Sequence, residues 1–333
     1  MNCTSEEADK LVNEFWEREW KHIKEIMFPP TREFPITLKE LLNEFKNIKL
    51  HHAENATAGQ RNNSKLIRYF HPSMFTASKG NRPSPTEYWK KLQEDSELFK
   101  KFYKNRLQCS DWFNEKNGAN KHFLYEGKVP DFIYGIGLTT SAKAPCVSYF
   151  KPYLAKYLIE TYLNDCDNLL DPFSGYSARL LGAWACNKNY TGIDINDTTV
   201  QESNELIQFM KDNKVLKDDI EINIKCTNSL SSKGSADAII ACPPYSDKNG
   251  KQIEIWQNSK GEKIICDKSC DEIIDYFVNN FDCKKYLFVV DGSSTKYNDY
   301  VVEMLENRNY INARNGEITK QSLNHEKIVL IEK

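Results

Sequence analysis

The stretch from Leu169 to Ala185 reads LLDPFSGYSARLLGAWA and joins a short apolar run to a glycine loop and a helical pattern. Two leucines and Asp171 complete a short apolar strand, and Pro172 and Gly175 then allow a sharp loop. Small and apolar residues at helical spacing follow from Ala178. A strand that runs through a glycine loop into a helix is typical of a parallel α/β sheet, and such a loop directs backbone N–H groups at a ligand.

The same alternation of strands and helices continues along the chain. The predicted strands are Asn168–Asp171, Tyr190–Asp194, Glu221–Cys226, Ala236–Ala241, Lys285–Asp291 and His325–Glu332. The predicted helices are Pro152–Leu163, Ala178–Cys186, Thr198–Asn213, Cys270–Phe281 and Asn298–Asn307. Strands separated by helices predict an α/β fold with a doubly wound, Rossmann-like parallel sheet.

The chain before residue 146 follows a different pattern. Amphipathic spacing predicts helices over residues 1–30, Thr37–Phe45 and Pro85–Leu107, with a polar loop between His51 and Lys65. We therefore predict two domains: a mainly helical one over residues 1–145 and an α/β one over residues 146–333.

The segment from Leu41 to Lys128 has an excess of basic residues, although the whole chain has a net charge of −2. A basic segment on an otherwise acidic chain favours a surface that faces a polyanion. The side chains expected to contact nucleic acid are Arg61, Arg68, Arg82, Lys90 and Lys104. The aromatic residues between them, such as Trp89, are expected to form the core of the helical domain.

Length and composition limit the class of protein. The 333 residues are 40% hydrophobic and 28% charged, which is ordinary for a globular protein. No apolar run is long enough to cross a membrane, and the acidic N-terminus lacks a signal-peptide pattern, so we expect a cytoplasmic protein. The 10 cysteines include no C-x-x-C pair and are expected to be reduced thiols, and no metal site is predicted.

Two further strand ends carry unusual residues, and ligands of a doubly wound sheet bind beyond the carboxyl ends of its strands. Asp194 ends the strand in YTGIDIND. An acidic residue about 20 positions after the first loop is placed to bind both hydroxyls of a ribose. Because the first loop lacks the glycine patterns of dinucleotide and triphosphate sites, the expected ligand is a nucleoside without phosphates.

The third strand end lies in ADAIIACPPYSDK, residues 236–248. Taken alone, its two prolines indicate a turn after a buried strand. Pro243 and Pro244 also remove two N–H donors, which leaves nearby carbonyls available to accept from an amino group. Tyr245 offers an aromatic face on which a base can stack.

Together, DPFSG, GID and CPPY resemble motifs of the S-adenosylmethionine-dependent amino-methyltransferases of DNA, whose loops read D-P-F-x-G and [D/N/S]-P-P-[Y/F/W]. The resemblance covers roughly residues 147–333 and implies a class I methyltransferase sheet that binds S-adenosylmethionine and methylates a flipped base. The implied catalytic residues are Cys242, Pro243, Pro244 and Tyr245. The implied cofactor contacts are Phe150, Pro152, Asp171, Phe173, Gly175, Asp194 and Asn228, and a turn or N-cap role for Asn228 is left open.

Cys242 departs from the family pattern, in which Asp, Asn or Ser takes this position. A thiol is a poor acceptor but is close to Ser in size, and in this family the Ser version leans toward cytosine N4 rather than adenine N6. Enzymes that methylate cytosine at carbon 5 use a thiolate nucleophile, and in them a proline precedes the cysteine. Here the prolines follow Cys242, and no His or Lys beside it would lower its pKa, so this mechanism is disfavoured.

The resemblance implies a site-specific DNA methyltransferase with double-stranded DNA as its partner, and with a restriction endonuclease as a possible partner in the cell. Because the α/β half has only short connections, target recognition is expected from residues 1–145, helped by the loop from Ser246 to Lys263. Two alternatives remain open. One is an RNA or protein amide methyltransferase, and the other is a DNA-binding relative that has lost catalysis.

Overall fold

The computed structural model describes residues 36–59, 64–79, 81–107, 149–245, 254–291, 296–305 and 326–333, with short pieces at 6, 9–10, 13–14, 252, 294, 310–311 and 318–319. The chain divides into two compact units. The unit that contains the main sheet consists of Pro35–Met74, Val147–Asn307 and Leu323–Lys333. The other consists of Met1–Phe34, Phe75–Cys146 and Arg308–Ser322.

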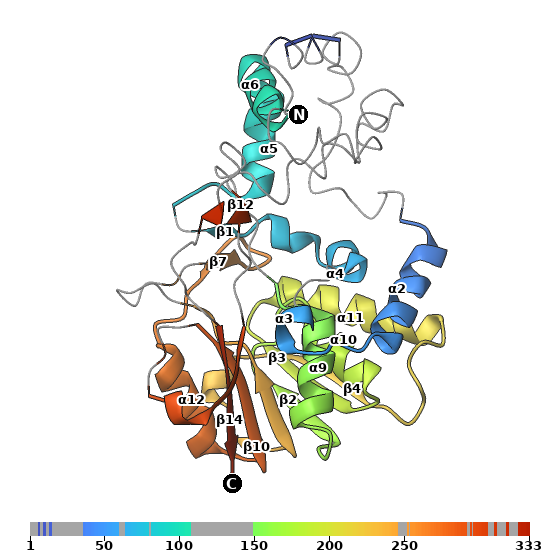
Figure 1. Cartoon of the computed structure of the whole chain (residues 1–333), viewed down its shortest axis with the longest axis vertical. Helices are drawn as coiled ribbons and strands as arrows, with labels where there is room; N and C mark the ends of the chain where they lie inside the picture. The colour runs from blue at the N-terminus through green and yellow to red at the C-terminus, as the bar shows by residue number, and fades with distance from the viewer. Residues whose placement is uncertain are drawn as a thin grey trace. The chain divides into compact units, whose positions relative to one another are not determined.

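The main sheet has seven strands in the order β11-β14-β10-β6-β2-β3-β4 (Figure 1). Their bounds are β2 Asn168–Asp171, β3 Asn189–Asp194, β4 Ile222–Cys226, β6 Ala238–Ala241, β10 Lys285–Val290, β11 Val301–Leu305 and β14 Glu326–Glu332. β2 pairs in parallel with β3 and β6, β3 with β4, and β6 with β10. β14 is antiparallel to both of its neighbours. The strand order reverses between β2 and β6, which confirms the predicted α/β, doubly wound, Rossmann-like fold.

Helices cover both faces of this sheet. They are α9 Pro152–Tyr162, α10 Ala178–Ala185, α11 Asp197–Asp212 and α12 Cys270–Asn280. Figure 1 shows α12 on one side of the sheet and α9, α10 and α11 on the other. Each of these helices starts and ends within two residues of its predicted position.

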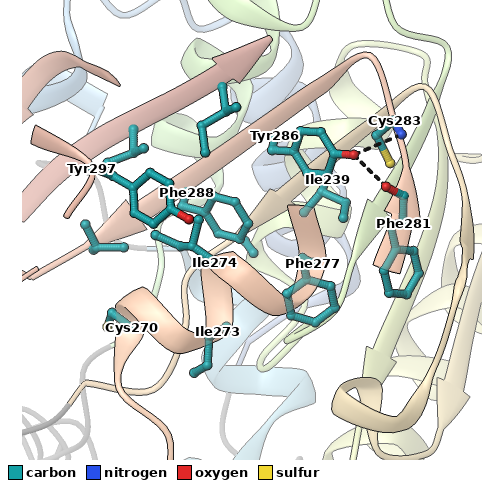
Figure 2. Close-up of a cluster of buried hydrophobic side chains, with 14 of the residues drawn as sticks. Ile239, Cys270, Ile273, Ile274, Phe277, Phe281, Cys283, Tyr286, Phe288 and Tyr297 are labelled. Carbon is teal, nitrogen blue, oxygen red and sulfur yellow. Dashed lines mark hydrogen bonds between the residues drawn. The ribbon is translucent and has the colours of Figure 1, made fainter. Parts of the chain in front are cut away.

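The core beneath α12 shows why this helix lies against β6 and β10. Ile273, Ile274 and Phe277 are completely buried in one cluster with apolar side chains of these strands, and Ile274 lies beside Phe288 of β10 (Figure 2). Tyr286 also lies in this core, and its hydroxyl donates to the Phe281 carbonyl at 2.6 Å and accepts from the Cys283 N–H at 3.2 Å. The polar end of a buried tyrosine is therefore satisfied within the cluster.

Three short helices before residue 75 belong to the unit of the sheet. They are α2 Leu38–Leu50, α3 Ala56–Gly59 and α4 Lys65–Phe70. The Phe45 ring packs edge-on against Trp184 of α10 at 5.3 Å, and Phe70 lies 5.2 Å from the ring of Phe209 in α11. The structure thus groups residues 35–74 with the sheet, whereas the predicted domain boundary at 145/146 placed them with the helical domain.

The other unit contains α5 Pro85–Glu94 and α6 Ser96–Leu107 where the sequence predicted one continuous helix. Asp95 separates them in an extended conformation, and its Oδ1 accepts from the Leu98 N–H at 2.9 Å at the start of α6. An aspartate that caps a following helix competes with continuation of the preceding one.

The described residues also form several short elements. These are η1 Pro72–Phe75, β1 Ser78–Lys79, η4 Ser229–Ser231, β5 Gly234–Ser235, β7 Glu254–Gln257, β8 Lys263–Ile264, β9 Phe281–Asp282, β12 Tyr310–Ile311 and β13 Ile318–Thr319.

The prediction of a helix at Asn298–Asn307 is wrong. The structure has a 3₁₀ turn, η5 Asn298–Tyr300, followed by strand β11 at the edge of the sheet. Val301, Glu303 and Leu305 alternate with more exposed residues along β11, and pairing with β14 satisfies its backbone groups on one side. Within the described ranges, no helix is long and apolar enough to cross a membrane.

The contact between α9 and α10 can be tested at Gly182, where an added Cβ would lie 2.5 Å from Ala155 Cβ and 2.8 Å from the Lys156 nitrogen. We expect Gly182→Ala to lower the free energy of unfolding by about 1–3 kcal/mol, measured by urea denaturation, because the helices would have to separate. Gly234→Ala is the matched control, since its Cβ would only touch the Phe281 ring at 3.5 Å. Similar losses in both variants would contradict this packing.

Candidate functional site

The carboxyl edge of the sheet brings three predicted segments together. Asp171 ends β2, Asp194 ends β3, and Cys242 directly follows β6. Because β2 lies between β3 and β6, the three strand ends are neighbours at the point where the strand order reverses. This is the position at which doubly wound sheets bind their ligands.

The loop after β2 is fixed to the end of β3. Gly175 has φ +51°, a conformation that favours glycine, and its N–H donates to Asp194 Oδ2 at 2.8 Å. The Asn196 N–H donates to Asp194 Oδ1 at 2.9 Å, and the Ser174 N–H donates to the Ile193 carbonyl at 2.9 Å. Burial raises the pKa of Asp194, and the two backbone donors oppose that shift. Asp194 therefore anchors the loop at the edge where it was predicted to bind a ribose.

Asp171 is completely buried among donors of its own chain. Arg179 donates to both carboxylate oxygens, with Nε 2.7 Å from Oδ2 and Nη2 3.2 Å from Oδ1. Tyr190 donates its hydroxyl to Oδ2 at 2.6 Å, and the Phe173 N–H donates to Oδ1 at 3.1 Å. The carboxylate thus holds the loop in shape, and its contact with the methionine part of a cofactor stays a prediction.

Arg179 is a residue that the sequence analysis missed. Its guanidinium also donates to the Phe173 carbonyl and lies over the ring of Phe150 at 5.0 Å. Phe150, two residues before α9, is thereby brought to the loop after β2, whereas Pro152 is the buried first residue of α9. The available signal was a lone arginine within the apolar helix ARLLGAWA, where a charge has to find a partner.

Ser177 ends the same loop in a left-handed conformation, with φ +60°, and its side chain is completely buried. Its hydroxyl lies 2.9 Å from His71 Nε2 and donates to Ser203 Oγ at 2.8 Å. His71 Nδ1 in turn lies 3.2 Å from Glu202 Oε2. A polar network that joins His71, from before the sheet, to Glu202 and Ser203 of α11 thus supports the start of α10, and none of its members was predicted.

The tetrapeptide after β6 forms a short chain of polar groups. The Cys242 thiol donates to the Tyr245 hydroxyl at 3.3 Å, and this hydroxyl donates to Glu326 Oε1 at 3.3 Å. Burial raises the pKa of Cys242 to about 12; Arg179 acts against this shift and Glu326 adds to it. Cys242 is therefore a neutral thiol near neutral pH, which agrees with the sequence argument against a thiolate nucleophile.

The ring of Tyr245 packs against the apolar cluster beneath α12. Pro243 is buried and Pro244 half-buried, and the Cys270 thiol lies 4.0 Å from the Pro244 carbonyl. The loop is therefore held from one side by α12 and from the other by the Glu326 contact. The predicted stacking of Tyr245 on a base stays a prediction.

Asn228 caps a short turn after β4. Its side-chain oxygen accepts from the Leu230 N–H at 3.0 Å at the start of η4, as in the open alternative. A contact with adenine stays a prediction.

The residue after Asp194, Ile195, is 52% exposed and gives this part of the edge an apolar surface that the sequence analysis did not single out.

The predicted DNA contacts are distributed over both units. Arg68 lies half-buried in α4 of the sheet unit, whereas Arg82 and Lys90 are exposed on the other unit, the latter in α5. Arg61 and the side chain of Lys104 lie outside the described residues. Trp89 and Phe99 are buried and pack edge-on at 6.0 Å, which confirms that Trp89 is a core residue.

Comparisons with known proteins give no family by sequence: no family model matches the chain, and no curated protein does. Among solved structures, the chain is similar to a SAM-dependent methyltransferase from Agrobacterium tumefaciens, with 11% identity, a TM-score of 0.38, and coverage of 58% of this chain and 65% of that chain.

Two further structures were determined with a ligand. Magnesium protoporphyrin IX methyltransferase from Synechocystis PCC 6803, with bound SAM, has 11% identity, a TM-score of 0.34, and coverage of 53% of this chain and 74% of that chain. An RNA methyltransferase from Salinibacter ruber, in complex with S-adenosyl-L-homocysteine, has 10% identity, a TM-score of 0.33, and coverage of 56% and 93%. TM-scores of this size carry no argument about function, which has to come from the site.

The buried ion pair can be tested with Arg179→Met, which leaves the Asp171 carboxylate buried without its cation. We expect the free energy of unfolding to fall by about 3–5 kcal/mol in urea denaturation. Lys296→Met is the control, because it removes a cation that pairs with Asp275 but is 55% exposed, and it should change stability by less than about 1 kcal/mol. A loss in Arg179→Met no larger than in the control would show that the pair does not fix the loop.

Proposed function

We propose that this chain is a methyltransferase that uses S-adenosylmethionine to methylate an exocyclic amino group of a base in double-stranded DNA, with cytosine N4 slightly favoured over adenine N6. One observation carries the proposal. The glycine loop anchored to Asp194 and the loop from Cys242 to Tyr245 meet at one edge of the sheet, at its topological switch point. A cofactor loop and a substrate loop at one edge are what a transfer between two bound molecules needs.

The residues at this edge fit the nucleoside part of the cofactor. Each oxygen of Asp194 accepts one backbone N–H, which leaves lone pairs for the two ribose hydroxyls. Ile195 is exposed beside it and can cover one face of an adenine. Gly175, with its positive φ, lets the backbone approach a ligand closely. When bound, S-adenosylmethionine supplies an electrophilic methyl group.

The loop after β6 suits a base that has left the duplex. The Pro243 and Pro244 positions offer carbonyls and no N–H donors, so they accept from an amino group. The apolar surroundings of Tyr245 exclude water from one side of the loop. An amino group that takes part in base pairing cannot reach such a site, so the target base has to be flipped out.

Methyl transfer is tested directly by incubating the protein with methyl-labelled S-adenosylmethionine and unmethylated duplex DNA, digesting the DNA to nucleosides and separating them. We expect label in N4-methylcytosine or in N6-methyladenine. RNA and a protein extract are treated in parallel. Label in RNA or protein with none in DNA would replace the DNA proposal with the RNA or protein amide alternative. No transfer at all would favour a relative that has lost catalysis.

Two substitutions should separate cofactor binding from substrate binding. Asp194→Ala removes the predicted ribose acceptor and should weaken S-adenosylmethionine binding about 10- to 100-fold in calorimetry. Tyr245→Ala should leave that affinity near wild type. It should weaken binding of the duplex DNA substrate by about 1–3 kcal/mol. Asp212→Ala, at the exposed end of α11, is the control for loss of an aspartate. Equal effects of the first two variants on cofactor affinity would contradict the assigned roles.

A further inference from the structure

Glu326 lies at the same edge as the predicted site although no motif marks it. It is the first residue of β14, which runs antiparallel to β10, with Val290 opposite Lys327. The start of an antiparallel strand lies at the edge where its parallel neighbours end. The side chain of Glu326 therefore lies at the carboxyl edge, two strands away from β6 and Cys242.

Contacts connect Glu326 to the loop after β6. The hydrogen bonds from Cys242 to Tyr245 and from Tyr245 to Glu326 are both 3.3 Å long, so one hydroxyl joins the thiol and the carboxylate. Glu326 is half-buried, and thus reachable from the edge. Its charge is also close enough to Cys242 to help raise the pKa of the thiol.

The three groups differ in what they can offer an amino group. An amino group that is to react as a nucleophile presents its N–H bonds to acceptors. The Cys242 thiol is neutral and directs its hydrogen at Tyr245, and the Tyr245 hydroxyl directs its hydrogen at Glu326. A carboxylate has no hydrogen to donate and accepts at about four positions on its two oxygens.

We infer that the Glu326 carboxylate accepts from the target amino group and so selects an amino group over a carbonyl at that position. It fills the acceptor role for which the thiol of Cys242 is poorly suited. This inference rests on the proposed function, because it assumes that an amino group is the methyl acceptor. A carboxylate attracts N–H bonds and repels a carbonyl oxygen, so the selection follows from charge alone.

The test measures binding, independently of methyl transfer, to an unmethylated duplex that contains a sequence the protein methylates. A second duplex has the target base replaced by its carbonyl counterpart, uracil for cytosine or hypoxanthine for adenine. Fluorescence anisotropy gives the ratio of the two dissociation constants for wild type and for Glu326→Gln. Changes in base pairing affect both proteins alike, so they cancel when the two ratios are compared.

We expect the preference for the amino base to fall about 10- to 100-fold in Glu326→Gln, because a glutamine amide can turn and bind either group. Cys242→Asp in the Glu326→Gln background returns a carboxylate to the site and should restore the preference. Glu332→Gln, at the exposed far end of β14, removes the same charge and should leave the ratio unchanged.

Two outcomes would overturn the inference. One is an unchanged preference in Glu326→Gln. The other is an equal loss of binding to both duplexes that Cys242→Asp does not restore, since that result would limit Glu326 to holding Tyr245. Failure of the proposed function is separate, because wild-type protein would then methylate no amino group of DNA in the labelling experiment.

Discussion

The site depends on one buried ion pair, between Asp171 at the end of β2 and Arg179 in α10. Neither charge can be left alone in the interior, so each fixes the position of the other. Tyr190 brings β3 into the same contact, and burial beside the carboxylate raises the pKa of its hydroxyl well above the usual value. The pair therefore joins a strand, a helix and a neighbouring strand, and the shape of the glycine loop between them follows from it.

The parallel part of the fold could be predicted because its strands are short apolar runs that end in distinctive residues. Asp171, Asp194 and Cys242 each end or follow such a run, and parallel strands place these ends at one edge. The edge at which the antiparallel strand β14 begins could not be predicted in this way. A sequence does not state the direction of a strand, and so Glu326, at the beginning of β14, gave no sign that it belongs to that edge.

Other differences arise where packing outweighs local spacing. Val301 to Leu305 fits the spacing of a helix as well as that of a strand, and the open side of β14 decides between them. Residues 35–74 look like part of a helical domain, but Phe45 and Phe70 find their aromatic partners on α10 and α11. Arg179 would ordinarily face solvent, and only a buried carboxylate eight residues earlier explains its position.

The state of Cys242 also bears on how the protein tolerates oxidants. Peroxides and alkylating agents attack thiolates, and a thiol with a pKa of about 12 is almost entirely protonated in the cell. Cys270 and Cys186 are shifted to about 12 in the same way, mainly by burial. Cys242, at the centre of the site, is therefore expected to react slowly with such agents near neutral pH.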